Sequence, residues 1–220
     1  MCSGFATPVL GESGLEKKRS SNLRKRVARE AAILLYESQE KEYKQAKKSA
    51  AKTLGARVLP SNLEVAKELD EIAAEKEGVS RHKLLIRLRK EALEIMKALK
   101  GFNPRLVGSV WSGTACRDSD IDILAFSFNA RHVLSVLQES GFKIASSGWR
   151  SVTKSGRKRS SFHIHLVLSS DDEAEVVVRH PDRIGQFEQC EIYGDAATGL
   201  GHSELEEVLE KRPLQRFMPS

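Results

Sequence analysis

The spacing of apolar residues changes near Gly101, and this change divides the chain. Before Gly101, apolar residues recur every three or four positions, which is typical of amphipathic helices; the clearest is expected over residues 84–99. After Gly101, short apolar runs are separated by turn residues, which is typical of strands and short connections. The sequence therefore predicts an α+β protein with a helical N-terminal region.

Four segments are expected along the chain. They are a flexible tail (1–20), a basic helical region (21–101), a strand-containing domain (102–180) and a C-terminal extension with a short helix (181–220). Within the domain, strands are expected at residues 105–107, 121–126, 142–146, 162–168 and 173–179, with a helix at 130–139 and a basic loop after residue 146. The last two strands are predicted to form a hairpin, and capping-box spacing predicts helices after Ser61 and Ser203.

Charge is unevenly distributed along the chain. The 36 Lys and Arg residues exceed the 30 Asp and Glu residues, which gives a formal charge of +6. Residues 1–100 hold 22 basic and 14 acidic side chains, whereas residues 101–220 hold 14 and 16. Excess positive charge attracts polyanions such as nucleic acid, but helices also carry Lys and Arg for solubility. Charge alone does not favour nucleic-acid binding over solubility as the reason for the basic residues.

Composition excludes several classes of protein. With 40% hydrophobic residues, 30% charged residues, 15 Gly and 6 Pro, the chain is neither collagen-like nor wholly disordered. No apolar run approaches the roughly 18 residues that a membrane span needs, so we expect no membrane partner. The 3 cysteines are far apart, which predicts neither a disulfide framework nor a zinc cluster and favours a cytoplasmic location.

A Gly-Ser turn and a pair of carboxylates mark the informative stretch of the sequence. A short strand leads to Gly108 and Ser109, and a glycine-containing connection then leads to a strand with Asp120 and Asp122. Because successive side chains of a strand point to opposite faces, the two carboxylates share one face. They are expected to converge, while the isoleucines beside them point the other way.

This arrangement suits a metal-bound triphosphate. Mg²⁺ is held by few carboxylates together with phosphate oxygens and water, and Mn²⁺ is the alternative ion. Gly108 lets the backbone approach a phosphate closely, and Ser109 offers its hydroxyl and amide to it. We therefore predict that Gly108 and Ser109 bind a nucleoside triphosphate and that Asp120 and Asp122 bind the metal.

The same stretch resembles the signature of the DNA polymerase beta-type nucleotidyltransferase superfamily. The tetrapeptides WSGT at residues 111–114 and SDID at residues 119–122 are especially similar to the minimal nucleotidyltransferases of bacteria and archaea. The order of elements supports the resemblance over residues 103–180. It implies a small, mixed-sheet nucleotidyltransferase domain beside the helical N-terminal region.

The resemblance also implies a third carboxylate on a later strand, which completes the metal site and helps to deprotonate the incoming hydroxyl. Glu175, at the start of an apolar run, is the candidate, and Glu173 on the same strand face is the second choice. The family usually has Asp at this position, and the extra methylene of Glu moves the carboxylate by about 1 Å. The predicted catalytic and metal-binding residues are Asp120, Asp122 and Glu175.

Two functions are consistent with these residues. The first is a nucleotidyltransferase that moves a nucleoside monophosphate from a nucleoside triphosphate to a hydroxyl acceptor by two-metal catalysis and releases pyrophosphate. The second is a catalytically inactive module of the same fold that binds nucleic acid or a partner protein, which the Glu at position 175 favours. The acceptor, whether RNA, a partner protein or a small hydroxyl compound, and the base of the triphosphate stay open.

Three weaker signals have a functional and a structural interpretation each. His163 and His165 share a strand face and could contact a metal or a nucleotide, although paired histidines of strands are more often structural. The basic run at residues 154–159, near Trp149, could contact a phosphate backbone with stacking, or could be a solvated turn. The basic run at residues 24–29 could hold a nucleic-acid acceptor, or could serve solubility.

Overall fold

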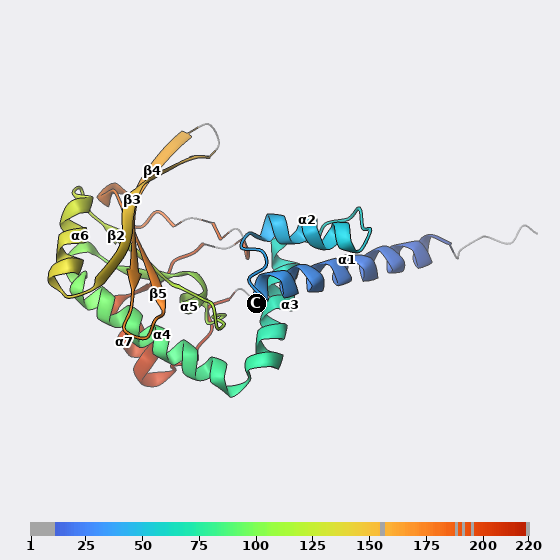
Figure 1. Ribbon diagram of the computed structural model, residues 1–220, viewed down its shortest axis with the longest axis horizontal. Coiled ribbons are helices and arrows are strands. Elements are labelled where there is room, and N and C mark those ends of the chain that lie inside the picture. Colours follow the sequence, from blue (N-terminus) through green and yellow to red (C-terminus); the bar gives the residue numbers. More distant parts are fainter. Residues whose placement is uncertain (1–11, 155–156, 188, 191, 195, 219–220) are drawn as a thin grey trace, which may run out of the picture. The chain divides into compact units, whose positions relative to one another are not determined.

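The chain forms two compact units, Met1–Glu75 and Lys76–Ser220. The computed structural model, shown in Figure 1, describes residues 12–154, 157–187, 189–190, 192–194 and 196–218. The first unit is helical, and the second combines helices with a six-stranded mixed sheet. The predicted α+β class is therefore confirmed. No helix among the described residues is long and apolar enough to cross a lipid bilayer.

The described part of the first unit contains three helices: α1 (Glu12–Tyr36), α2 (Tyr43–Thr53) and α3 (Asn62–Glu77), the last of which runs two residues past the boundary. Their buried faces are rich in alanine, as the helical spacing predicted; examples are Ala28, Ala32, Ala46, Ala50 and Ala73. Helix α1 begins at Glu12 and not at Ser21, so part of the segment expected as a flexible tail is helical. Residues 1–11 lie outside the described residues.

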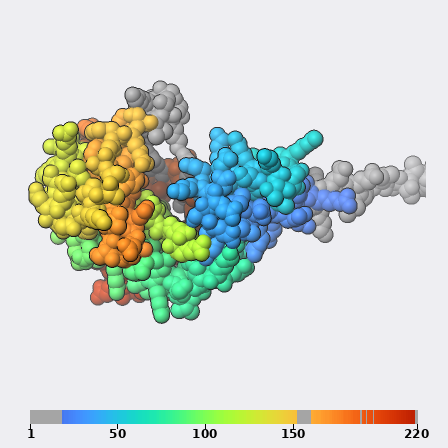
Figure 2. Space-filling view, viewed as in Figure 1, coloured from blue at the N-terminus to red at the C-terminus, as the bar shows by residue number. Residues whose placement is uncertain are grey.

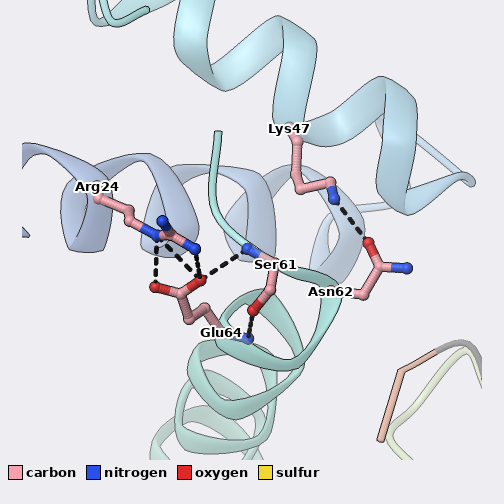
Figure 3. A network of polar contacts seen from close by, with 5 residues as sticks. All are labelled: Arg24, Lys47, Ser61, Asn62 and Glu64. Carbon is pink, nitrogen blue, oxygen red and sulfur yellow. Dashed lines mark hydrogen bonds and ion pairs between the residues drawn. The ribbon is translucent and has the colours of Figure 1, made fainter. Parts of the chain in front are cut away.

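The capping box predicted at Ser61 is present and is tied to α1 (Figure 3). The Ser61 amide donates to Glu64 Oε2 (2.7 Å), and the Glu64 amide donates to Ser61 Oγ (3.1 Å). Arg24 of α1 donates to the same carboxylate, with Nε 2.8 Å from Oε1 and Nη2 2.7 Å from Oε2. This hydrogen bonding from Arg24 is the main reason that the pKa of Glu64 falls to about 2. Nearby, Lys47 Nζ donates to Asn62 Oδ1 (2.7 Å).

The basic run of α1 is neutralised within its own unit. Besides the Arg24 pair, Arg29 contacts Glu68 (3.3 Å) and Glu75 (3.1 Å), and Lys25 lies 3.8 Å from Glu68. Side chains that already face carboxylates have less positive potential to offer a polyanion. These ion pairs favour the structural interpretation of residues 24–29 over the nucleic-acid interpretation.

The sheet of the second unit has the strand order β3-β4-β5-β2-β1-β6. Its strands are β1 (Arg105–Val107), β2 (Ile121–Phe126), β3 (Lys143–Lys154), β4 (Arg157–Val167), β5 (Glu173–Arg179) and β6 (Leu200–Gly201). Strands β2 and β5 are parallel, and all other neighbours are antiparallel. The predicted hairpin is confirmed, because Val167 of β4 pairs with Glu173 of β5.

Helices cover the face of the sheet opposite the carboxylates. They are α4 (Val79–Ala98), α6 (Ala130–Glu139) and α7 (His202–Lys211), while the short α5 (Gly108–Ser112) and the 3₁₀ turns Lys100–Phe102 and Pro181–Arg183 connect elements. The core joins Leu88 and Ile95 of α4 to Ile121, Ile123 and Val176 of the sheet, all of them fully buried. The polar residues that alternate with these sheet residues are thereby left on the other face.

The boundary between the units differs from the one expected after residue 101. The break lies between Glu75 and Lys76, so α4 belongs with the sheet. The reason is the apolar stripe of this helix, in which Leu88, Ala92 and Leu99 are fully buried in the core of the second unit. Spacing alone identified the stripe but not the surface that buries it.

Two further expectations are corrected in the second unit. The strand expected to end at residue 146 continues as β3 to Lys154, and β4 begins at Arg157, so the expected basic loop is mostly paired strand. Helix α7 begins at His202, and its first turn is capped by Glu204, whose Oε2 accepts from the Gly201 amide (2.6 Å). The cap therefore lies two residues before the one expected at Ser203 and Glu206.

Candidate active site

Gly108 and Asp122 meet where β1 turns into α5. Gly108 has φ +72°, a left-handed conformation that glycine adopts readily, and it opens α5 with Ser109 as the next residue. A Cβ atom at position 108 would overlap Asp122 Oδ2. The turn therefore needs glycine both for its backbone conformation and for the space that the Asp122 carboxylate occupies.

The two aspartates share one face of β2, as predicted. Asp120 directly precedes the strand and Asp122 is its second residue, while Ile121 and Ile123 are fully buried on the opposite face. Across the parallel β2–β5 pair, Asp122 lies in register with Glu175. The predicted carboxylates thus come from adjacent strands and lie close enough to influence one another's ionisation.

Burial and mutual repulsion raise the pKa values of the aspartates. Desolvation, with repulsion from Asp120 and Glu175, raises the pKa of Asp122 to about 7. Asp120 keeps a solvent-exposed edge, but desolvation of its carboxyl, with repulsion from Glu175 and Glu173, still raises its pKa. Burial and repulsion thus disfavour the charged forms of these carboxylates, and a bound cation would neutralise them.

The chemistry of this pair fits a divalent cation that also binds substrate phosphates. Mg²⁺ typically takes one or two carboxylates and fills its other positions with phosphate oxygens and water. Among the described residues, no three His, Cys, Asp or Glu side chains are arranged as a ready metal cage. Asp120 and Asp122 can supply the two carboxylates, and Glu175 would need to turn toward them to become a third.

Glu175 is engaged by neighbours on the sheet, which distinguishes it from Glu173. Its Oε1 lies 2.8 Å from His163 Nδ1, 3.3 Å from His165 Nε2 and 3.7 Å from Arg150 Nη1. Its side chain is only 18% exposed, whereas Glu173 is exposed. Register with Asp122 and this fixed environment both favour Glu175 over Glu173 as the third carboxylate.

The histidines were recognised from the sequence, but their partner was not. His163 and His165 flank the Glu175 carboxylate, and His163 Nε2 also contacts Ser161 Oγ (2.8 Å). The connection between β4 and β5 comprises residues 168–172, and the resulting register places His165 directly opposite Glu175. The four-residue connection expected from the sequence would have placed His165 opposite Val176, so the sequence did not identify this pair.

A small pocket adjoins Asp120. It has a volume of about 280 Å³, and its polar lining residues are Asp120, Ser146, His165 and Glu173. Besides Asp120, the pocket is lined by residues of β3, β4 and β5. In Figure 2 the surfaces of β3, β4 and β5, coloured yellow to orange, lie together on the second unit.

Two buried arginines of α4 donate hydrogen bonds to backbone carbonyls of residues 110–115, and the sequence predicted neither set of contacts. Arg81, 8% exposed, donates to the carbonyls of Thr114 (2.7 Å) and Ala115 (2.8 Å). Arg89, fully buried, donates to the carbonyls of Val110 and Trp111 in α5. When polar and apolar residues alternate along a helix, the sequence does not indicate which arginine will bind backbone carbonyls.

Arg89 also ties the C-terminal segment to α5. Its guanidinium donates to the carbonyls of Pro213 (2.7 Å) and Gln215 (2.8 Å), and the ring of Phe217 stacks on Trp111 with centroids 6.5 Å apart. Burial lowers the pKa of Arg89 to about 10, so the side chain stays charged near neutral pH. The four carbonyl partners replace the water that this cation loses.

Comparisons with known proteins give structural likenesses only. No family model matches the chain, and no curated protein matches it in sequence. Among solved structures, Cid1 in complex with the UTP analogue UMPNPP matches with 16% identity and a TM-score of 0.34, over 54% of this chain and 37% of that one. A cytoplasmic RNA terminal U-transferase matches with 16% identity and a TM-score of 0.30, over 56% of this chain and 35% of that one.

A third solved structure, the GLD-2/RNP-8 complex, matches with 16% identity and a TM-score of 0.29, over 52% of this chain and 40% of that one. The chain thus spans well under half the length of each of these three chains.

Proposed function

We propose that this protein is a metal-dependent nucleotidyltransferase that moves a nucleoside monophosphate from a nucleoside triphosphate to a hydroxyl acceptor. The observation that carries the proposal is the joint placement of Asp120, Asp122 and Glu175 beside the Gly108 turn. Three carboxylates in mutual repulsion are unfavourable in a purely structural role, whereas they suit a site that binds cations and phosphates.

The residues divide the work of the reaction. Gly108 and Ser109 are proposed to position the triphosphate, and Asp120 and Asp122 to hold Mg²⁺ or Mn²⁺. When bound, the metal would neutralise the phosphates and stabilise the charge that develops at the α-phosphorus. The acceptor oxygen forms a bond to the α-phosphorus while the bond to the bridging oxygen of pyrophosphate breaks. Glu175 is proposed to help remove the proton of the acceptor hydroxyl.

The proposed activity can be tested with α-labelled nucleoside triphosphates, Mg²⁺ or Mn²⁺, and bulk RNA or cell extract. We expect transfer of label by the wild-type protein and a loss of at least 100-fold in Asp120→Asn, because one of the carboxylates for the metal is removed. Asp118→Asn is the matched control, since Asp118 is an exposed neighbour that pairs with Arg117. Absence both of transfer and of triphosphate binding with either metal would overturn the proposal.

One observation favours the alternative of an inactive module. Glu175 is held by His163 and lies near His165 and Arg150, so the third carboxylate is occupied by other partners. A protein of this second kind would bind triphosphate or nucleic acid without transferring label under any metal. The same assay therefore separates the two functions.

A further inference from the structure

The Glu175 carboxylate is held at one of its two oxygens. Its Oε1 lies 2.8 Å from His163 Nδ1, 3.3 Å from His165 Nε2 and 3.7 Å from Arg150 Nη1. Among the residues that the structure describes, none donates a hydrogen bond to Oε2, and that oxygen is not sealed from solvent. The carboxylate therefore has one engaged oxygen and one accessible oxygen.

His163 is the hydrogen-bond donor to the engaged oxygen. His165 Nε2 accepts from Arg150 Nη2 (2.9 Å), because a guanidinium can only donate. That nitrogen consequently has no proton for Glu175, and Arg150 Nη1 at 3.7 Å is too far away for a hydrogen bond. Arg150 contributes positive charge, whereas His163 Nδ1 supplies the directional contact to Oε1.

A second contact fixes the orientation of the His163 ring. A carboxylate can only accept, so Nδ1 carries the ring proton. In the neutral ring Nε2 is then an acceptor, and it lies 2.8 Å from Ser161 Oγ. The residues on either side of His163 in β4, Phe162 and Ile164, are buried, which anchors the strand. The ring is thus held at both nitrogens and by its backbone.

This contact opposes a force that would otherwise move Glu175 away from the site. Asp122 lies in register with Glu175, and repulsion from Glu175 contributes to the raised pKa values of both Asp120 and Asp122. A flexible carboxylate beside two others tends to turn into solvent, where its charge is screened. The Glu175 side chain is nevertheless only 18% exposed.

We propose that His163 is a positioning residue, which holds Oε1 of Glu175 and leaves Oε2 to serve the metal and the acceptor hydroxyl. The role in transfer rests on the proposed function; the role in metal binding does not. The length of the glutamate matters for this contact, because a carboxylate shorter by one methylene would retreat by about 1 Å and lose the hydrogen bond.

The opposite interpretation of the same contacts is that they withhold Glu175 from the site, as in an inactive module. The two interpretations predict opposite effects of removing His163: metal affinity falls if the histidine positions the carboxylate and rises if it withholds it. The accessible Oε2 favours positioning. Partners of ligating carboxylates typically contribute 10- to 100-fold to metal affinity or activity.

The experiment measures Mn²⁺ affinity by electron paramagnetic resonance without triphosphate or acceptor, and then kcat and KM for label transfer. The variants are His163→Ala and His163→Asn, whose amide nitrogen can replace Nδ1 as a donor. His180→Ala is the control, because His180 also faces a carboxylate, that of Asp182 (3.2 Å), outside the cluster. Circular dichroism confirms that all variants remain folded.

We expect His163→Ala to weaken Mn²⁺ binding and to lower kcat, each at least ten-fold, with KM for the triphosphate within a few-fold of wild type. His163→Asn should restore most of both, and His180→Ala should stay within two-fold of wild type. Glu175→Asp should also fall below wild type, and adding His163→Ala to it should cost little more, since the contact is already lost.

A spectroscopic readout is independent of metal and of activity. In the metal-free protein, nitrogen NMR of labelled histidines should show the proton of His163 on Nδ1. Glu175→Ala should remove this preference, whereas His180→Ala should leave it unchanged. An unchanged signal in Glu175→Ala would mean that the hydrogen bond does not form in solution, and the proposal would fail.

Three other outcomes would overturn the proposal: wild-type or tighter Mn²⁺ binding by His163→Ala, a Glu175→Asp variant that equals wild type, or no Mn²⁺ binding by the wild-type protein. The result is distinguishable from that of the transferase assay. If Mn²⁺ binding depends on His163 but no label is transferred, the proposed function fails and the positioning role stands. If His163→Ala transfers label as fast as wild type, the reverse holds.

Discussion

The Asp122 carboxylate occupies the space that a side chain at position 108 would need. This contact couples the turn between β1 and α5 to the acidic strand β2, although the two residues are far apart in sequence. It explains why a glycine with φ +72° stands at this position, and it makes Gly108 a sensitive point of the site.

Gly108→Ala should impair both folding and triphosphate binding. The left-handed backbone costs a non-glycine residue roughly 1–2 kcal/mol, and the added methyl group would also displace Asp122. Urea denaturation measures the loss of stability, and titration with a fluorescent triphosphate measures the loss of binding. Gly101→Ala is the control, because a Cβ atom added at Gly101 would meet no atom within 4 Å and Gly101 has no positive φ. Wild-type binding by Gly108→Ala would show that Asp122 tolerates displacement.

Asp122→Asn should stabilise the metal-free protein at pH 8. Its carboxyl has a pKa of about 7 against an ordinary value of 3.8, so the folded state holds the proton more tightly than the unfolded chain. The free energy of unfolding should therefore fall as pH rises from about 4 to about 7, by at most about 1.4 kcal/mol per pKa unit.

Urea unfolding with EDTA at pH 4 and pH 8 tests this expectation. The stabilising effect of Asp122→Asn should be present at pH 8 and largely absent at pH 4, where the folded-state carboxyl is protonated and that of the unfolded chain is about half protonated. Asp118→Asn should show no such difference, because Asp118 lies outside the carboxylate cluster. A variant that is less stable than wild type at pH 8 would mean that the aspartate is satisfied by its surroundings.

Glu175→Gln and Glu173→Gln should separate the two candidates for the third carboxylate. Glu175 lies in register with Asp122 and is mostly buried, whereas Glu173 is exposed. We expect Glu175→Gln to lower the transfer rate by about 100-fold, in line with the loss of a catalytic acid or base, and Glu173→Gln to stay within a few-fold of wild type. Mn²⁺ binding, followed by electron paramagnetic resonance, gives a second readout. The opposite ranking would assign the role to Glu173.

Arg89→Met should destabilise the second unit by about 3–5 kcal/mol. Methionine matches the length of the stem but leaves the carbonyls of Val110, Trp111, Pro213 and Gln215 without a donor in a buried place. Chemical denaturation measures the loss, and Lys90→Met on the exposed side of α4 is the control. If the two variants are equally stable, water has replaced the guanidinium.

Local periodicity predicted the central part of the candidate site. Alternation along a strand placed Asp120 and Asp122 on one face, and a short connection predicted that β4 and β5 form a hairpin. Both are properties of a few consecutive residues, so no distant contact was needed to infer them. The engagement of Glu175 by His163 and Arg150 could not be inferred in this way, because β3 and the extent of its pairing were misjudged.

The sequence by itself determined the α+β class, the placement of Asp120 and Asp122 on one face of a strand, and the total positive charge. These properties depend only on local spacing and composition. Only the tertiary structure decided which surface buries α4, why Arg81 and Arg89 lie inside, and which carboxylates neutralise the basic run of α1. The physical reason is that burial and charge neutralisation depend on partners far along the chain: α3 supplies carboxylates to the basic run of α1, and β5 supplies the Glu175 carboxylate to His163 and Arg150.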